Sequence, residues 1–492
     1  MTVSGDLDFG GCQALIVGLG REGTALARFL AEHGAQVTVT DKKSAEELAD
    51  SLAALTGVPV TLALGGHPLE LLDNVDIVFV SPGVPLEIPL LAEAQRHGVP
   101  LSSETRLFTR LCPAPVIGVT GSSGKTTTTT LVGEMLKAGG RRTWVGGNIG
   151  QPLIGHVGEI APGDVVVMEL SSFQLEFFGA WPGTQRQRGT LFDPRGWSPQ
   201  IAAILNITPN HLDRHPTMEA YTAAKAHMVA EQEPGDTAVL NLDDAVTRRM
   251  GEEILRRFGP QNDDGSGKRR VVWFSLDAGR EIEEGAFLRS GELVVRLEER
   301  EAVVCRAEEV KLIGRHNLAN LLAACALAGT AGVPVKAMRR VATTFAGVEH
   351  RLELVRQRGG VRWYNDSIAT SPERAAAALR AFEAPVVLLA GGRDKHLPWG
   401  EMAALAQHKV RHLILFGEAA GLIERAMQAV SGTERVCEIH QAATLERAVE
   451  LAAQLAQPGD VVLLSPGGTS FDAYRDFVAR GEHFRKLVKA LA

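Results

Sequence analysis

One stretch constrains the fold of this chain more than any other: a glycine-rich loop that follows a short apolar run. The apolar run is Val116–Thr120, and the loop reads Gly121-Ser-Ser-Gly-Lys-Thr126. Such a loop offers successive backbone N–H groups to a phosphate, a lysine ammonium to the terminal phosphates and a hydroxyl to Mg²⁺. The sequence therefore predicts a strand, a phosphate-binding loop and a helix, the central unit of an α/β nucleotide-binding domain.

The glycine spacing in this loop departs from that of the common P-loop. The usual first glycine, five residues before Gly124, would fall at Val119, and Gly118 and Gly121 flank that position instead. A simple glycine turn before a helix is the alternative interpretation. Lys125 followed by a run of threonines argues against it, because β-branched residues lower helix propensity and are a poor choice for stability alone.

A second glycine-rich loop lies about a hundred residues earlier. Gly18-Leu-Gly-Arg-Glu-Gly23 follows the apolar run Ala14–Val17 and opens a helical pattern. Asp41 closes the next strand pattern, close to the spacing expected for an acid that binds a ribose. A nicotinamide dinucleotide site, another anion site and a purely structural turn all remain open. Lys42 and Lys43 favour a ligand rich in phosphate.

Length and strand–helix alternation predict three consecutive α/β domains. A chain of 492 residues exceeds what one hydrophobic core usually supports. Apolar runs alternate with helical patterns, which indicates parallel sheets with crossover helices. We expect a Rossmann-like domain over residues 1–112, a P-loop ATPase-like domain over 113–347 and a second Rossmann-like domain over 348–492. We also expect an antiparallel meander between 291 and 307 and a helix from about 317 to 331.

Composition limits the classes of protein to consider. The formal net charge of −7 argues against a nucleic-acid-binding protein. Five scattered cysteines without a Cys-x-x-Cys pair fit a reducing cytoplasm and no structural zinc. The N-terminus shows no secretory signal, and no apolar run approaches the length of a membrane span. We therefore expect a cytoplasmic protein without a membrane span, acting as a monomer on small molecules.

Further strings resemble the motifs of one known family, the Mur ligases, which add amino acids to the bacterial peptidoglycan precursor. The loop from Thr120 to Thr127 resembles the ATP loop of that family. The matching strings elsewhere are Gly146–Gly150, Glu169–Gln174, Asn206–Arg214, Ala223–Lys225, Gly314–Asn317, Gly347–Arg351, Asn365–Ser367, Gly391–Lys395 and Ser465–Phe471. Gly18–Gly20, Ser81–Gly83 and Glu169–Gln174 are most similar to the branch of the family that adds D-glutamate.

The resemblance implies an ATP-dependent amide ligase. ATP would phosphorylate the carboxylate of a UDP-N-acetylmuramoyl-alanine substrate, and the amine of D-glutamate would attack the acyl phosphate. The two glycine loops would then serve two nucleotides, the first loop the UDP-sugar and the second loop ATP. Because a carboxylate must approach an anionic γ-phosphate, cations are required, and the resemblance implies two Mg²⁺ ions.

The resemblance also assigns roles to individual residues. The ATP contacts would be Gly121, Ser122, Ser123, Gly124, Lys125, Thr126, Thr127, Asn241, Arg351 and Asp366. The UDP-substrate contacts would be Gly18, Gly20, Asp41, Lys42, Ser81, Gly83, Asn148, Ser171 and Gln174. The D-glutamate contacts would be Thr370, Lys395, Ser470 and Phe477. The metal ligands would be Thr126, Glu169, His211 and a carbamylated Lys225. The catalytic residues would be Lys125, His211, Lys225 and Lys395.

Plainer interpretations stay open for several of these residues. Asn148, Ser171 and Gln174 could cap a loop and a helix. Asn241 could close a turn after a strand, and Glu169 could be a buried acid paired with a neighbour. Three charged residues could instead lie on a helix surface or a linker: Lys225, Arg351 and Asp366.

The chain departs from the family pattern at three places. Ile368 occupies a position where the family often has lysine, so one contact to a carboxylate or phosphate is in doubt; Arg374 or Lys395 could compensate. Gly467–Thr469 replaces a more usual Ala-Cys-Ala segment. The stretch 181–196 has no assigned role.

Competing functions belong to different classes. Sibling ligases that add another amino acid are the nearest, and folylpolyglutamate synthetase lacks an N-terminal UDP-sugar domain. An ATP-regulated binding or motor protein would use the second glycine loop without an amino-acid pocket. A nicotinamide dehydrogenase would use the first loop and no ATP. Dependence of phosphate release on both the sugar-nucleotide and the amino acid separates these classes.

Overall fold

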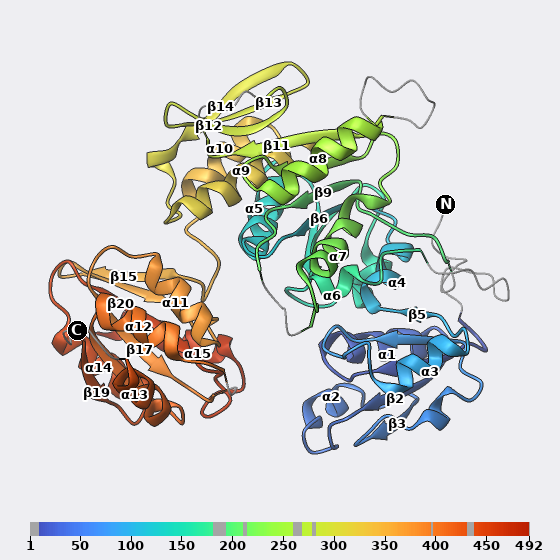
Figure 1. The fold of residues 1–492 in the computed structure, drawn as a ribbon, viewed down its shortest axis with the longest axis horizontal. Helices are drawn as coiled ribbons and strands as arrows, with labels where there is room; N and C mark the ends of the chain where they lie inside the picture. Colours follow the sequence, from blue (N-terminus) through green and yellow to red (C-terminus); the bar gives the residue numbers. More distant parts are fainter. Residues whose placement is uncertain are drawn as a thin grey trace. The chain divides into compact units, whose positions relative to one another are not determined.

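The computed structural model describes residues 9–180, 193–209, 214–258, 268–277, 282–394, 397–430 and 437–491. Within these ranges the strands form three separate sheets flanked by helices (Figure 1). The chain divides into two compact units, Met1–Val310 with Arg315–Thr344, and Lys311–Gly314 with Phe345–Ala492. The first unit holds two of the sheets and the second unit the third. This architecture confirms the α/β class, and the three domain limits stay predictions.

The N-terminal sheet, blue in Figure 1, has five parallel strands in the order β3-β2-β1-β4-β5. This order matches the first five strands of the doubly wound dinucleotide-binding fold, whose full order is 3-2-1-4-5-6. Its strands are β1 Gln13–Val17, β2 Gln36–Asp41, β3 Val60–Leu64, β4 Ile77–Val80 and β5 Leu101–Ser102. Its helices are α1 Arg21–Glu32, α2 Ala49–Ala54, α3 Pro89–Arg96 and α4 Glu104–Leu111.

The central sheet has nine strands in the order β14-β13-β12-β11-β10-β9-β6-β8-β7. The strands from β12 to β14 run antiparallel to one another, which confirms the expected meander; the others are parallel. The strands are β6 Val116–Thr120, β7 Thr143–Gly147, β8 Val165–Glu169, β9 Ile201–Ile204, β10 Thr237–Asn241, β11 Arg270–Ser275, β12 Gly285–Arg289, β13 Glu292–Leu297 and β14 Arg300–Arg306. The helices are α5 Lys125–Ala138, α6 Ser172–Leu175, α7 Met218–Ala230, α8 Ala245–Phe258, α9 Arg315–Thr330 and α10 Val335–Thr344.

The third sheet has six strands in the order β15-β16-β20-β17-β18-β19, of which only β15 is antiparallel to its neighbour. Apolar residues of both sheet faces are buried beneath helices, so β17 and β20 are buried along their whole length. The strands are β15 Glu353–Arg358, β16 Val361–Asn365, β17 Val386–Gly391, β18 Val410–Phe416, β19 Glu438–Gln441 and β20 Val461–Gly467. The helices are α11 Pro372–Arg380, α12 Gly400–Lys409, α13 Ala420–Ala429, α14 Leu445–Leu455 and α15 Phe477–Ala490.

A buried arginine connects the N-terminal and central parts of the first unit. Arg106 on α4 is 2% exposed and donates hydrogen bonds to four backbone carbonyls of the central part. Three of these donor–acceptor distances are 2.7 Å to Gly179, 3.0 Å to Asp193 and 2.7 Å to Arg195, and the fourth acceptor is Phe177. Burial lowers the pKa of Arg106 to about 10, so the guanidinium stays charged at neutral pH. Among the described helices, none is long and apolar enough to cross a membrane.

Candidate functional site

The phosphate-binding loop predicted from sequence lies between β6 and α5. Gly124 has φ +83°, a conformation that L side chains rarely adopt, and a Cβ there would lie 2.2 Å from Asn320 Oδ1. The helix α5 begins at Lys125 and has 14 residues. Its first backbone N–H groups have no carbonyl partner within the helix, so they are available to a ligand at the loop. Lys125 Nζ donates to the carbonyls of Gly121 at 3.0 Å and Ser122 at 3.5 Å. The local geometry is that of an anion site at a helix N-terminus.

Asn206, just after β9, braces this loop. Its backbone carbonyl accepts from Ser122 N at 2.9 Å, and its Oδ1 accepts from Ser123 N at 2.9 Å. Tyr221 OH donates to Ser122 Oγ at 3.1 Å. Two of the backbone N–H groups that we expected to face ATP are therefore used to hold the loop, and the start of α5 supplies the remaining ones.

Two amide side chains and one carboxylate gather at the same edge, because β6, β7, β8, β9 and β10 are parallel. Glu169 ends β8 and is 2% exposed. Asn148 Nδ2 donates to Glu169 Oε1 at 2.8 Å, and Oε2 has no hydrogen-bond partner among the described residues. Asn241 ends β10, where Nδ2 donates to Leu205 O at 2.9 Å and Oδ1 accepts from Asp243 N at 2.9 Å. Asn241 thus closes a turn after β10, which was the plainer of the two interpretations of its sequence.

Lys225 on α7 is 1% exposed. Its Nζ donates to Thr120 Oγ1 at 3.3 Å and lies 4.8 Å from the ring centroid of Tyr221. Burial and, less strongly, nearby Lys125 lower the pKa of Lys225 to about 6 against the opposing effect of Glu169. The amine is therefore mostly uncharged at neutral pH, and the alternative of a solvated surface lysine is wrong.

The first glycine loop shows why its glycines are needed. A Cβ on Gly23 would lie 2.0 Å from Gly18 O, so α1 packs directly on the loop. Gly18 has φ +99°, and a Cβ there would meet Ser81 and Val84 at 2.9 Å. At Gly20 a Cβ would have no atom within 4 Å, so this glycine leaves its backbone open to a ligand.

The predicted ligand residues around this loop are mostly tied to its backbone. Asp41 accepts from Leu19 N at 2.7 Å and from Lys43 N at 2.9 Å, one bond on each carboxylate oxygen. Ser81 Oγ donates to Gly18 O at 2.8 Å. Lys42 is exposed. Asp41 and Ser81 therefore shape the loop, Lys42 is an exposed cation beside it, and a Cβ on Gly83 would meet nothing within 4 Å.

Ser171 and Gln174 form a capping box at the start of α6. Gln174 is fully buried, and its Nε2 also donates to Glu22 Oε1 at 2.9 Å and Thr105 Oγ1 at 3.2 Å. The capping interpretation is thus confirmed for Ser171. The contacts of Gln174 join α6 to α1 and α4, across the boundary between the N-terminal and central parts.

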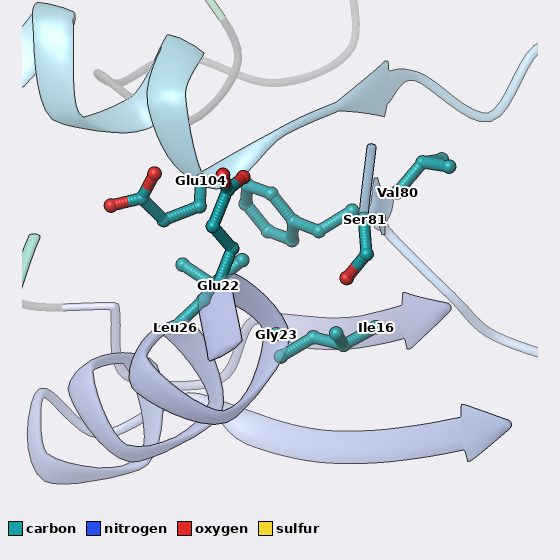
Figure 2. A pocket seen from close by; sticks show the side chains of 8 residues that line it. Ile16, Glu22, Gly23, Leu26, Val80, Ser81 and Glu104 are labelled. Carbon is teal, nitrogen blue, oxygen red and sulfur yellow. The ribbon is translucent and has the colours of Figure 1, made fainter. Parts of the chain in front are cut away.

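Glu22 and Glu104 line one small pocket with Ile16, Leu26, Phe79 and Ser81 (Figure 2). Burial and, less strongly, the charge of Glu104 raise the pKa of Glu22 to about 8. Burial also raises the pKa of Glu104 to about 7, although Ile154 N donates to its Oε1 at 3.2 Å. Two carboxyl groups so placed cannot both ionise without a penalty, so the pair retains a proton near neutral pH.

The loops after β16, β17 and β20 meet at the carboxyl edge of the third sheet. Asp366 follows β16 and is 4% exposed. Ser465 Oγ donates to its Oδ2 at 2.8 Å and Leu352 N to its Oδ1 at 3.2 Å. Burial raises the pKa of Asp366 to about 7 in spite of these bonds and nearby Arg351, which oppose the shift. A surface position for Asp366 is therefore wrong.

Arg480 on α15 holds two of these loops together. It is fully buried and donates to Ser367 Oγ at 3.0 Å and Ser367 O at 2.9 Å. It also donates to Gly468 O at 3.2 Å and Thr469 O at 3.0 Å. Burial lowers the pKa of Arg480 to about 10, which leaves it charged at neutral pH.

Two of the expected D-glutamate residues, Ser470 and Phe477, lie next to groups that this arginine binds. Ser470 is 2% exposed and follows Thr469 directly, and Phe477 O accepts from Ser367 Oγ at 2.8 Å. Thr370 N donates to Ile368 O at 2.8 Å. Arg374 Nη1 donates to the same Ile368 carbonyl at 3.3 Å, so a cation lies beside the position where lysine was missing. Two expected site residues lie outside the described residues: His211 and Lys395.

Comparison with known proteins finds matches in all three α/β parts of the chain. A family model described as "Mur ligase MurD-like, N-terminal domain" matches residues 12–103. "Mur ligase middle domain" matches 119–328, and "Mur ligase, glutamate ligase domain" matches 350–468. A curated UDP-N-acetylmuramoylalanine--D-glutamate ligase from Symbiobacterium thermophilum is 45% identical over 480 residues, which cover 98% of each chain.

This chain belongs to the Mur ligase family. A second ligase of the same name, from Pelotomaculum thermopropionicum, is 40% identical over 484 residues, 98% of this chain and 99% of the relative. A solved UDP-N-acetylmuramate-alanine ligase from Thermotoga maritima has the same fold, with a TM-score of 0.55 at 18% identity over 97% of this chain and 99% of that one. As a Mur ligase the chain is an enzyme, an ATP-dependent amide ligase.

The buried charges that hold this Mur ligase together, namely Glu22, Glu104, Arg106 and Arg480, were not predicted from the sequence. A signal was present for two of them, Arg480 and Glu22. Phe477, Phe484 and Val488 follow helical spacing, and Arg480 lies on the same stripe. A charge on an apolar stripe predicts a buried ion with specific partners. Glu22 stands similarly four residues before Leu26 on α1.

Proposed function

We propose that this Mur ligase joins D-glutamate to UDP-N-acetylmuramoyl-alanine in peptidoglycan precursor synthesis, through an acyl phosphate formed with ATP. Identity of 40–45% to ligases of that name over nearly the whole chain supports the choice of substrates. The observation that carries the chemistry is the gathering of Lys125, Glu169 and Lys225 at the carboxyl edge of the central sheet.

The loop at the start of α5 would bind the phosphates of ATP. The N–H groups that begin the helix would face the anion. Lys125 would give up its hydrogen bonds to the loop carbonyls and bind the terminal phosphates instead. Gly121, Ser122, Ser123, Thr126 and Thr127 complete the cradle. Asn241, which ends β10, would contact the adenine. Holding both reactants in line lowers the barrier through position and charge compensation.

The residues at this edge fit Mg²⁺. Glu169 offers a buried carboxylate oxygen that has no partner among the described residues, which is an oxygen ligand of the kind Mg²⁺ prefers. Thr126 would supply a hydroxyl and His211 a further ligand for a second ion. When bound, Mg²⁺ offsets the repulsion between the substrate carboxylate and the γ-phosphate.

Lys225 would complete the metal site as a carbamate. An amine must be uncharged to attack CO₂, and burial lowers the pKa of Lys225 to about 6, so the reactive form dominates at neutral pH. Nitrogen would form the new bond to carbon, and the lost proton would pass to solvent. The product would be a carboxylate-like ligand near Glu169, in place of a neutral amine that carries no charge to offset that of Mg²⁺.

The sugar-nucleotide would lie against the first glycine loop. Gly18 and Gly20 let the diphosphate approach the backbone, and Lys42 supplies a nearby cation. Asp41, Ser81 and Gly83 shape the surface that meets the uridine. The residues that would position the muramoyl-alanine arm are Asn148, Ser171 and Gln174. Through the bond that Asn148 donates to it, Glu169 would connect the two proposed nucleotide sites.

The third sheet would bind D-glutamate. Thr370, Ser470 and Phe477 surround the junction that Arg480 holds, and Lys395 would bind a substrate carboxylate. Arg374, beside Ile368, supplies the cation that the missing lysine would have given. Arg351 and Asp366 would reach ATP from this side.

We further propose that the three domains have limits at 112/113 and 347/348, and that the enzyme acts as a cytoplasmic monomer. Five scattered cysteines without a Cys-x-x-Cys pair, four of them buried, support a reducing compartment.

A panel of amino acids tests the proposed function. The purified enzyme is given ATP, Mg²⁺ and UDP-N-acetylmuramoyl-L-alanine, and phosphate release and product mass are measured for each amino acid. We expect D-glutamate to be the one amino acid that gives release and an amide product. Turnover with L-alanine or a diamino acid would point to a sibling ligase. Phosphate release without the sugar-nucleotide or amino acid would point to an ATP-driven switch.

A further inference from the structure

The third sheet carries two histidines and a glutamate on adjacent strands, at some distance along the strands from the loops described above. His412 lies near the start of β18, and Glu438 and His440 lie on β19, the edge strand. The parallel register pairs His412 with Glu438 and Ile414 with His440. Since side chains alternate between faces with a period of two, all three project from the same face.

The ligand atoms of these residues have the spacing of a metal site. His412 Nδ1 lies 3.2 Å from His440 Nε2 and 3.3 Å from Glu438 Oε2. His440 Nε2 lies 3.8 Å from the same carboxylate oxygen. Around a tetrahedral Zn²⁺ with bonds of about 2.0–2.1 Å, two ligand atoms are separated by about 3.3 Å. The three atoms therefore already stand close to the corners of one face of such a tetrahedron.

The surroundings allow an ion to enter and the ligands to bind it. The side chain of His412 is 11% exposed, that of His440 is 27% exposed and that of Glu438 is 71% exposed. The buried ring is thus fixed, while the carboxylate can move to meet the ion. Neighbouring Arg411 pairs with Asp460 at 3.0 Å, so its charge is compensated. Unprotonated imidazole prevails above the usual histidine pKa of about 6.5.

We propose that His412, Glu438 and His440 bind one divalent transition-metal ion of the zinc class, with water as the fourth ligand. Two imidazoles and one carboxylate form a ligand set that Zn²⁺ adopts in proteins. The ion would fasten β19, a four-residue edge strand, to β18. The absence of a Cys-x-x-Cys pair predicts that there is no cysteine-bound structural zinc. That prediction does not concern a site built from imidazoles and a carboxylate. This site is independent of the proposed ligase substrates.

Metal titration of the full chain tests the site. The protein is stripped with a chelator and titrated with Zn²⁺ by calorimetry, with excess Mg²⁺ present to occupy oxygen-rich sites. His440→Gln and Glu438→Gln remove ligands that are partly or largely exposed, so both variants should fold. His156→Gln is the matched control, because His156 is exposed and pairs with a single carboxylate, Glu159, at 2.9 Å. Titration with Co²⁺ adds a visible spectrum that reports tetrahedral coordination.

We expect the unaltered chain and His156→Gln to bind one tight equivalent of Zn²⁺. His440→Gln should bind that equivalent at least about 10-fold more weakly, since even indirect partners of a metal change its affinity by 10–100-fold. Zn²⁺ should raise the melting temperature of the unaltered chain and not that of His440→Gln. No tight equivalent in the unaltered chain, or the same affinity and Co²⁺ spectrum in His440→Gln, would overturn the proposal.

Discussion

Lys225 shows a conflict between stability and chemistry at a single residue. Its amine is buried and its pKa is lowered from 10.5 to about 6, chiefly by burial. At pH 7.5 the Lys225 amine therefore binds a proton in the unfolded chain and not in the folded chain. This difference in proton binding lowers the free energy of unfolding. The free energy of unfolding that is lost in this way is regained as pH rises from about 6 towards 10.5. The residue is retained, we infer, because a neutral amine is needed.

Lys225→Met should make the protein more stable and inactive. In metal-free, bicarbonate-free buffer at pH 7.5 we expect the free energy of unfolding to rise by roughly 2–4 kcal/mol, because one pKa unit corresponds to about 1.4 kcal/mol. The gain should shrink as pH approaches 10. Denaturant unfolding over this pH range measures it, with Lys137→Met, an exposed lysine of α5, as control. A gain that does not change with pH would contradict the buried neutral amine.

A carbamate on Lys225 is directly observable. With ¹³C-labelled bicarbonate, the unaltered protein should show a carbamate resonance in its ¹³C spectrum, and Lys225→Arg should not. Ligase activity should depend on bicarbonate in the unaltered protein. A carbamate resonance that persists in Lys225→Arg, or full ligase activity of Lys225→Arg, would contradict the assignment of the carbamate to Lys225.

Gly124 gives a second test at the scale of one residue. In Gly124→Ala the new Cβ would enter a left-handed conformation and lie 2.2 Å from Asn320 Oδ1. We expect a loss of about 1–3 kcal/mol in stability from backbone strain and at least tenfold weaker ATP binding. Gly155→Ala is the control, because no atom lies within 4 Å of its Cβ. ATP binding by calorimetry unchanged from the unaltered chain would show that the loop does not hold the nucleotide.

At the scale of elements, α1, α4 and α6 meet around the buried carboxyl pair Glu22 and Glu104, where Gln174 Nε2 donates to Glu22 Oε1. Both folded pKa values are raised above the usual carboxyl value, so the stability that their protonated forms provide is present at low pH and is lost as pH rises through about 7–8. Glu22→Gln stays neutral and keeps an acceptor for Gln174 Nε2. It should therefore be more stable than the unaltered chain at pH 8.5, by about 1–3 kcal/mol, and little different at pH 5.

Thermal or denaturant unfolding at both pH values measures this difference. Glu46→Gln, which alters an exposed acid of the same sheet region, is the control and should show no pH-dependent gain. An equal effect of Glu22→Gln at pH 5 and pH 8.5 would mean that Glu22 is ionised in the folded protein at both.

Arg480 joins two loops, and its removal should affect both stability and substrate binding. Arg480→Met leaves the carbonyls of Ser367, Gly468 and Thr469 without their buried donor, which should lower the free energy of unfolding by about 2–4 kcal/mol. Because these loops surround the proposed D-glutamate pocket, the KM for D-glutamate should rise more than the KM for ATP. Arg475→Met, an exposed arginine of the same segment, should leave both unchanged. Equal increases in both KM values would contradict a local role.

The helices and strands themselves were largely predictable from the sequence, whereas the side-chain contacts that join distant elements were not. The loop at Gly121–Thr126, the meander before Arg306 and α9 follow from local signals of glycine position, alternation and helical period. The bonds of Gln174 to Glu22, and of Arg106 to the chain beyond Phe177, join residues far apart in sequence. Local patterns carry no information on such partners. For the same reason Asn241 and Ser171 could be assigned to turn and cap, but their contacts to a ligand stay predictions.

At the scale of the whole molecule, the proposed reaction requires all three α/β parts. The first sheet presents a glycine loop, the central sheet an ATP loop, and the third sheet a cluster of loops around Arg480. Each has its own hydrophobic core or shares one with its neighbour in the first unit. Substrate binding should therefore be interdependent, with phosphate release in the presence of all three substrates far above that with any two.

The most direct test of the central claim follows an oxygen atom. UDP-N-acetylmuramoyl-L-alanine is prepared with ¹⁸O in its carboxylate and given to the enzyme with ATP, Mg²⁺ and D-glutamate. If the carboxylate is phosphorylated, one ¹⁸O must leave with the phosphate when the amine attacks, and the ³¹P spectrum of the released phosphate should show the isotope shift. Amide formation with unlabelled phosphate would contradict an acyl phosphate, and with it the proposed mechanism.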